Sequence, residues 1–101
     1  MNIKVVQKRI IDNKISKGFG ITEVNKEFLL LYGEVAEAYG AYLKGDRVEL
    51  GSELADVAIY LLGLAKILDI DIEDEIERKL DINEKRVYVK LPNGEFVKKT
   101  C

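Results

Sequence analysis

The chain has 101 residues, which favours a single domain, and its 48% apolar and 34% charged residues indicate a globular protein rather than a disordered one. It contains no histidine, which excludes a catalytic triad with a histidine base and a histidine-ligated zinc site. The lone Cys101 excludes an intrachain disulfide and a cysteine metal cluster, so any chemistry must rest on carboxylates, on lysine and arginine, or on a metal held by oxygen atoms.

The first half of the chain is expected to form two helices. Apolar residues recur at three- and four-residue spacing over residues 2–16, as in an amphipathic helix. Thr22 is the expected N-cap of a second helix that runs to about Lys44, where Gly45 supplies a C-terminal stop.

The second half is expected to form two further helices and a hairpin. Asp46 is the expected cap of a third helix, which runs to about Leu68 and is apolar on nearly every side, as a helix in the centre of a bundle or an oligomer is. Asp71 is the expected cap of a fourth helix that lasts to about Arg86. The alternating pattern of residues 87–98, around a Pro-Asn-Gly turn, predicts a β-hairpin that needs support from the helices or from another subunit. The predicted fold is therefore all-α, a four-helix bundle completed by oligomerisation, with a short C-terminal β-hairpin tail.

Two pairs of acidic residues lie on the second and third expected helices. Glu34 and Glu37 are three residues apart on one helix, and Glu53 and Asp56 have the same spacing on the next, so each pair occupies one helix face. If the chain folds back at Gly45, Glu37 and Glu53 each lie eight residues from the turn, while the other two acids each lie eleven residues away. An antiparallel helical hairpin would bring the four carboxylates to matching heights among apolar neighbours.

Such a cluster of carboxylates carries an energetic penalty. Like charges at this spacing cost a few tenths of a kcal/mol on an exposed helix, and burying them without partners costs far more. A divalent cation removes the penalty, and an all-oxygen ligand set favours Mg²⁺, with Mn²⁺ as a second choice. The alternative interpretation is a solvated acidic face. Glu27 and Glu49, which could extend the acidic face, are expected to be surface charges.

Lys79, Asn83 and Arg86 share one face of the fourth expected helix. If this helix folds back on the third near Ile70, Asn83 and Arg86 come close to the acids. A cation together with lysine, asparagine and arginine side chains is suited to binding a polyphosphate. The alternative is a basic helix end that interacts with its own dipole.

Taken in order, these motifs resemble those of the MazG-like nucleoside triphosphate pyrophosphohydrolases, whose signature is Glu-Glu-x-x-Glu followed by Glu-x-x-Asp. Residues 33–37 match the first half, except that Gly33 stands in place of the leading acid, and residues 53–56 match the second half fully. Further matches are Gln7, the Lys17-Gly18-Phe19 turn, and the spacing of Lys79, Asn83 and Arg86. We assign residues 1–88 to a MazG-like helical domain and residues 89–101 to a hairpin tail of the same domain.

The resemblance implies a Mg²⁺-dependent enzyme that cleaves a ribo- or deoxyribonucleoside triphosphate into the monophosphate and pyrophosphate, as in nucleotide-pool cleaning. It implies that the metal ions and the attacking water are held by Glu34, Glu37, Glu53 and Asp56. It implies that the substrate is contacted by Lys79, Asn83, Arg86 and Gln7. Side chains that could flank the base are Gln7, Phe19, Tyr32, Tyr39 and Tyr60, although the aromatic ones also fit the core. Members of the family form intertwined dimers or pairs of dimers, so a homodimer or homotetramer is expected.

Two other classes of function fit the same sequence. The chain could be a catalytically silent module that binds nucleotide or metal, with Gly33 as the sign of lost activity. Alternatively, it could be a structural dimerisation domain whose acids pair with lysine and arginine across an interface.

Charge and hydropathy bear on partners and location. A net charge of −2 and a pI near 5.2 favour neither nucleic acid nor a membrane as partner. The apolar run Val57–Ala65 is too short to cross a bilayer, and the N-terminus lacks the apolar stretch of a signal peptide. The expected location is cytoplasmic, and Cys101 is expected to be an incidental exposed thiol.

Overall fold

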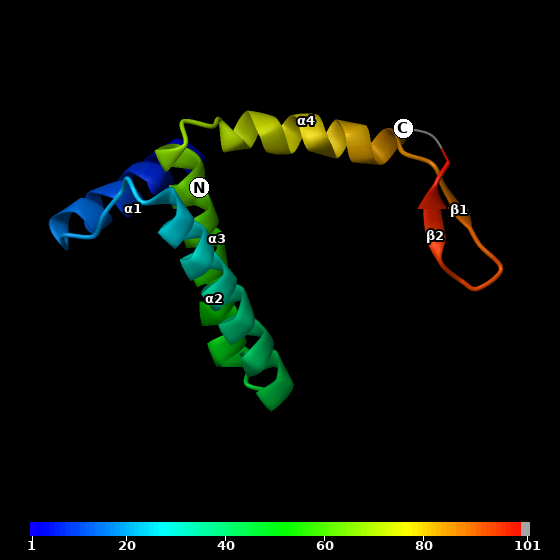
Figure 1. Ribbon diagram of the computed structural model, residues 1–101, viewed down its shortest axis with the longest axis horizontal. Helices are drawn as coiled ribbons and strands as arrows, with labels where there is room; N and C mark the ends of the chain where they lie inside the picture. The colour runs from blue at the N-terminus through cyan, green and yellow to red at the C-terminus, as the bar shows by residue number, and fades with distance from the viewer. Residues whose placement is uncertain (100–101) are drawn as a thin grey trace.

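The structure, a computed structural model, describes residues 1–99, so Cys101 lies outside the described residues. In chain order the elements are α1 (Ile3–Ser16), α2 (Val24–Lys44), α3 (Arg47–Ile67), α4 (Ile72–Lys85), β1 (Tyr88–Lys90) and β2 (Phe96–Lys98). The two strands pair antiparallel, with Val89 opposite Val97. Figure 1 shows this arrangement, which confirms the predicted all-α class and the small hairpin.

The ends of the helices follow their capping residues. The side chains of Asp46 and Asp71 each accept a hydrogen bond from the backbone N–H three residues on, at 3.0 and 3.1 Å. Gly45 ends α2 in the left-handed conformation with φ 74°, which lets the chain reverse directly into α3. The start of α2 differs from expectation, because Glu23 rather than Thr22 is the N-cap and its side chain makes no capping hydrogen bond.

The turn at residue 45 makes α2 and α3 an antiparallel hairpin, along which the two helices lie side by side (Figure 1). α1 crosses one end of this hairpin and packs on α3, where a Cβ at Gly63 would lie only 3.0 Å from the Ile10 side chain. That close approach favours glycine at this position. The buried apolar side chains of the described chain are Ala38 and Ala41 on α2 and Leu64 and Ala65 on α3.

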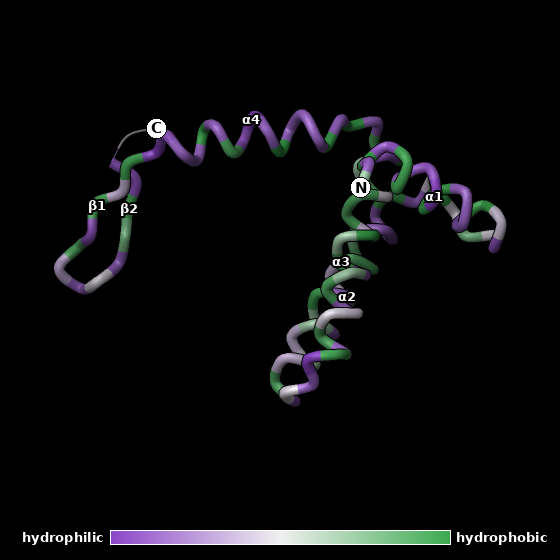
Figure 2. Tube along the Cα trace, turned by 180° about the vertical axis from the view of Figure 1, so that it is seen from behind, coloured by the Kyte–Doolittle hydropathy of each residue, from purple (hydrophilic) through white to green (hydrophobic). Residues whose placement is uncertain are grey.

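α4 does not fold back on α3, which corrects the expectation of a reversal near Ile70. Figure 1 shows α4 extending away from the α2–α3 hairpin and carrying the β-hairpin at its far end. The molecule therefore measures 54 × 35 × 28 Å. Figure 2 shows hydrophobic positions recurring along the mainly hydrophilic α4, and among them Ile76 and Leu80 are exposed. An apolar stripe left exposed by residues 1–99 is typical of a helix that packs against a partner.

Among residues 1–99, no helix combines the length and the apolar character that crossing a membrane would need.

Candidate metal centre

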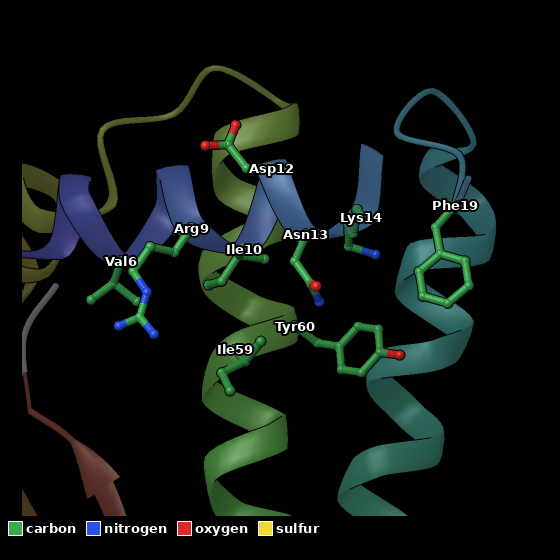
Figure 3. Close-up of a pocket in the computed structure, with 9 residues that line it drawn as sticks. All are labelled: Val6, Arg9, Ile10, Asp12, Asn13, Lys14, Phe19, Ile59 and Tyr60. Atoms are coloured by element: carbon green, nitrogen blue, oxygen red, sulfur yellow. The ribbon is translucent and has the colours of Figure 1, made fainter. Parts of the chain in front are cut away.

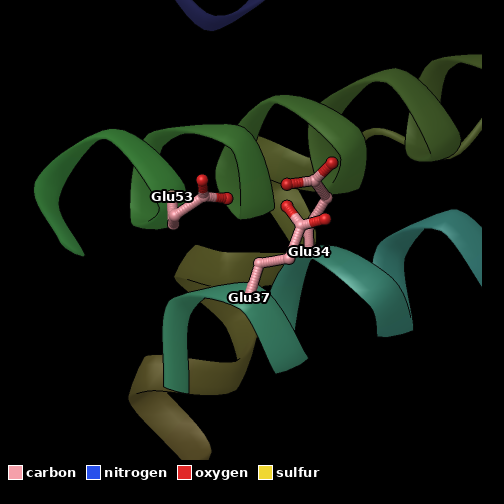
Figure 4. Close-up of side chains that lie close together, drawn as sticks. All are labelled: Glu34, Glu37 and Glu53. Carbon is pink, nitrogen blue, oxygen red and sulfur yellow. The ribbon is translucent and has the colours of Figure 1, made fainter. Parts of the chain in front are cut away.

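Three carboxylates meet where α2 and α3 face each other. Oxygen atoms of Glu34, Glu37 and Glu53 all lie within 4.8 Å of one another. Figure 4 shows the three side chains extending into the space between the two helices, two from α2 and one from α3. The bend at Gly45 thus brings Glu53 of the second acidic pair to the height of Glu34 and Glu37.

Asp56 lies at the edge of this group. It is half-buried on α3, one turn beyond Glu53, and it is not among the closely grouped acids. Its charge is still close enough to contribute to raising the pKa of Glu34. The fourth predicted acid is therefore near Glu34 but outside the close group of three.

Two oxygen atoms of the cluster are cut off from solvent. Glu34 Oε2 and Glu53 Oε2 are buried and have no hydrogen-bond partner within residues 1–99. Burial, followed by the charge of Glu37, raises the pKa of Glu34. Burial and then contact with Glu37 raise the pKa of Glu53 to about 7. Both shifts reflect first the loss of solvent around the carboxylates and then the neighbouring negative charges.

The described residues offer the cluster no basic partner. The ion pairs found within residues 1–99 join Lys8 to Asp12, Lys14 to Glu27 and Arg78 to Glu75, and none of them involves the clustered acids. A divalent cation would supply the missing positive charge and would bind the two buried oxygens that lack a hydrogen bond within residues 1–99. The donor set is entirely oxygen, which fits Mg²⁺ or Mn²⁺.

The metal-free protein is expected to lose stability as pH rises from 4.5 to about 7. Glu53 keeps its proton up to a pKa of about 7 in the folded protein, against an ordinary value of 4.5. The folded state therefore binds more protons than the unfolded state in this interval, and its stability falls as these protons are lost. Melting temperatures measured in chelator across this range should decrease, and Glu53→Gln should flatten the decrease. A melting temperature that rises with pH in the wild type, with no change in slope in the variant, would contradict the assignment.

The structure does not bring the predicted phosphate-binding residues to the acids within one chain. Lys79 and Asn83 are exposed on α4, and Arg86 is half-buried directly after it. Figure 1 shows α4 extending away from the α2–α3 hairpin, so the helix that carries Lys79 and Asn83 leads away from the carboxylate cluster of its own chain.

The predicted base-flanking residues fall into different places. Gln7 is buried, and its Nε2 donates a hydrogen bond of 2.9 Å to the carbonyl of Leu62, which ties α1 to α3. Tyr32 and Tyr39 are exposed on α2 rather than packed in a core of their own chain.

Phe19 and Tyr60, in contrast, line one cavity of about 650 Å³. It is bounded by α1, the turn after α1, and α3. The other lining residues are Val6, Arg9, Ile10, Asp12, Asn13, Lys14 and Ile59. Figure 3 shows Asn13 and Lys14 projecting from α1 on the side where Tyr60 and Phe19 lie. The cavity combines apolar walls with a few polar groups, as small-molecule sites commonly do.

One expectation about the surface is wrong. Glu27, expected to be a surface charge, is only 4% exposed, and both its oxygens accept hydrogen bonds from Lys14 Nζ, at 2.9 and 3.0 Å. The available signal was weak: Glu27 lies seven residues before Glu34 and thus on the same face of α2. The partner, Lys14, lies thirteen residues earlier on a different helix, so no regular spacing in the sequence indicates the pair.

Comparisons with known proteins place these features in a family. The sequence model described as the MazG-like family matches residues 15–95. A dATP/dGTP diphosphohydrolase of Salmonella phage PMBT28 is 34% identical over 88 residues, which are 86% of this chain and 28% of that protein. A dATP/dGTP diphosphohydrolase of cyanophage S-2L is 36% identical over 61 residues, which are 60% of this chain and 58% of that protein. The matched part is thus about a quarter of the first relative and somewhat more than half of the second.

A solved structure has the same fold over the full chain. It is the cyanophage S-2L MazG-like pyrophosphohydrolase bound to dGDP and three catalytic Mn²⁺ ions per active site. It aligns with a TM-score of 0.70 and 26% sequence identity, and the alignment covers 99% of both chains.

Proposed function

Because the chain belongs to the MazG-like family, we propose that it is a divalent-metal-dependent pyrophosphohydrolase that converts a deoxynucleoside triphosphate into the monophosphate and pyrophosphate. The observation that carries the proposal is the convergence of Glu34, Glu37 and Glu53, with two buried oxygens that have no hydrogen bond within residues 1–99. The names of the two phage relatives favour dATP and dGTP as substrates. Removal of such nucleotides fits a role in nucleotide-pool cleaning.

The acids near the middle of the α2–α3 hairpin would hold Mg²⁺ or Mn²⁺, with Asp56 completing the set of four carboxylates. Bound divalent cations supply charge neutralisation for the triphosphate and increase the acidity of an attacking water. A carboxylate that is not fully engaged by cations would orient this water toward the α-phosphorus. Gly33 lacks the side chain of the family's leading acid, and a Cβ built there meets no atom within 4 Å, so the position is open space.

A second copy of the chain would complete the site with Lys79, Asn83 and Arg86. Ile76 and Leu80 are exposed on the face of α4 that also carries Lys79 and Asn83. Exposed apolar residues also follow α2 along its length: Leu29, Tyr32, Val35, Tyr39, Tyr42 and Leu43. A homodimer in which α4 of one copy packs on the helical hairpin of the other would cover apolar surface on both elements. The same packing would bring the basic residues toward the acids.

The cavity lined by Phe19 and Tyr60 would take the nucleobase. Tyr60 follows Glu53 by seven residues and Asp56 by four, so all three share one face of α3, with Tyr60 about 10 Å from Glu53 along the axis. A nucleotide whose phosphates lie at the acids can then extend along the hairpin toward the cavity. Aromatic walls suit a purine ring, which stacks on them regardless of its substituents.

The direct test is a panel of nucleoside triphosphates with Mg²⁺ or Mn²⁺, monitored for pyrophosphate release. We expect release from dATP and dGTP, and loss of release in chelator. Turnover that fails across the panel at high enzyme concentration would contradict the proposal. Calorimetry then identifies the alternative, because a catalytically silent module binds nucleotide or metal without releasing pyrophosphate, whereas a structural dimerisation domain binds neither.

A further inference from the structure

A buried ion pair links the three helices around the proposed base cavity. Lys14 on α1 is 9% exposed and Glu27 on α2 is 4% exposed. Lys14 Nζ also lies 5.2 Å from the centroid of the Tyr60 ring on α3, which is cation–π distance. The pair therefore connects α1, α2 and α3 at one point.

The ammonium of Lys14 contacts two side chains of the protein, those of Glu27 and Tyr60. It has three N–H donors, of which two are required by the two oxygens of Glu27, and its remaining charge faces the ring of Tyr60. Lys14 is therefore expected to affect a ligand mainly through Glu27 and Tyr60, the side chains that it contacts.

The groups that it holds are walls of two adjoining cavities. Lys14, Phe19 and Tyr60 line both the 650 Å³ cavity and a second cavity beside it, which Glu27 also lines. The backbone N–H of Phe19 donates to the backbone carbonyl of Lys14 at 2.9 Å, a bond in which the Lys14 side chain takes no part. Phe19 itself is 59% exposed and has no extensive packing of its own to hold it.

We propose that Lys14 and Glu27 are positioning residues, which hold Tyr60 as one aromatic wall of the nucleobase site. This inference rests on the proposed function, because it assigns that cavity to the base of the nucleotide. The pair sets the affinity for the nucleoside part of the substrate, while metal binding and the chemical step belong to the acids about 10 Å further along the hairpin.

A stability role alone gives a weaker account of the pair. Buried ion pairs are often no more stabilising than apolar residues of similar volume, although removing one partner alone leaves a costly buried charge. The double variant Lys14→Met/Glu27→Leu is therefore expected to fold with near wild-type stability but without the fixed contact to Tyr60. The single variant Lys14→Met is expected to be less stable than the double variant, because it leaves the buried charge of Glu27 without a partner.

The test measures the binding of dGMP and dAMP, without metal, by calorimetry in the full-length protein, together with KM and kcat for dGTP. In the double variant we expect affinity for the monophosphates to fall about tenfold or more and KM to rise by a similar factor. We expect kcat and the affinity for Mn²⁺ to stay close to wild type. Lys4→Met, at an exposed lysine on the same helix, is the matched control and should change neither affinity nor KM.

The possible outcomes separate this inference from the proposed function. A stable double variant that binds dGMP as the wild type does would overturn the inference, as would a wild type that binds neither monophosphate. A fall in kcat at unchanged KM would also overturn it. If pyrophosphate release fails while monophosphate binding depends on Lys14 and Glu27, the positioning role stands and the proposed enzyme activity does not.

Discussion

Glu53→Gln is expected to reduce pyrophosphate release by at least about 100-fold. Replacing a residue that only hydrogen-bonds to a metal ligand typically costs about 10- to 100-fold in activity, and replacing the ligand itself should cost more. The same substitution is expected to raise the melting temperature of the metal-free protein at pH 8. The physical reason is that Glu53 shares a confined space with Glu34 and Glu37, one of its oxygens is buried, and its pKa is raised to about 7. A neutral amide of the same shape removes one negative charge from this cluster, but it also removes a metal ligand.

The variant is thus expected to be more stable without metal but less active. Thermal melts with and without Mn²⁺ measure the stability, and Mn²⁺ should raise the melting temperature less in the variant than in the wild type. Glu77→Gln, which makes the same change at an exposed position of α4, is the matched control and should leave both quantities unchanged. An active Glu53→Gln enzyme, or a variant that melts well below the wild type in chelator, would contradict the metal-centre assignment.

Two inactive variants, Glu53→Gln and Arg86→Ala, are expected to restore activity when they are co-expressed. If the acids of one copy work with Arg86 of another, a mixed dimer carries both substitutions in one site and none in the other. Random assortment of two variants makes half of the dimers mixed, so about a quarter of the wild-type activity should return. The expectation depends on the direction of α4, which leads away from the acids of its own chain.

The matched control combines Glu53→Gln with Glu37→Gln. Both substitutions fall on the same α2–α3 hairpin, so every site of a mixed dimer carries one of them, and no activity should return. Activity restored in this control would show that the acids of two chains share a site. If mass spectrometry demonstrates mixed dimers of Glu53→Gln and Arg86→Ala but no activity returns, Arg86 either lies outside the site or acts with the acids of its own copy.

The part of the fold that local rules determine could be predicted from the sequence. The end of α2 and the start of α3 follow from Gly45 and Asp46, because a left-handed glycine and an N-cap aspartate act within one turn of the helix end. The acidic cluster follows from the same two residues, since residues equally far from a tight turn meet in an antiparallel hairpin. The proximity of Glu53 to Glu37 is therefore determined almost entirely by the turn between the two helices.

Features that depend on tertiary packing could not be predicted in the same way. The direction of α4 is set at residues 68–71, where no spacing rule distinguishes a helix that folds back on its own chain from one that extends toward a partner. The pairing of Lys14 with Glu27 depends on how α1 crosses the hairpin, and an isolated glutamate on a polar stretch is more often solvated. Gln7 shows the same limit: its match to the family motif did not reveal that its amide is bonded to Leu62.

We propose that the acids of α2 and α3 form a divalent-cation site. The most direct measurement is a crystal structure with Mn²⁺ and a non-hydrolysable analogue of dGTP, with manganese located by its anomalous scattering. We predict anomalous peaks within bonding distance of Glu34, Glu37 and Glu53, with the α-phosphate beside them. Peaks at other carboxylates only, or acids paired with lysine or arginine of a second copy and no manganese between them, would contradict the account.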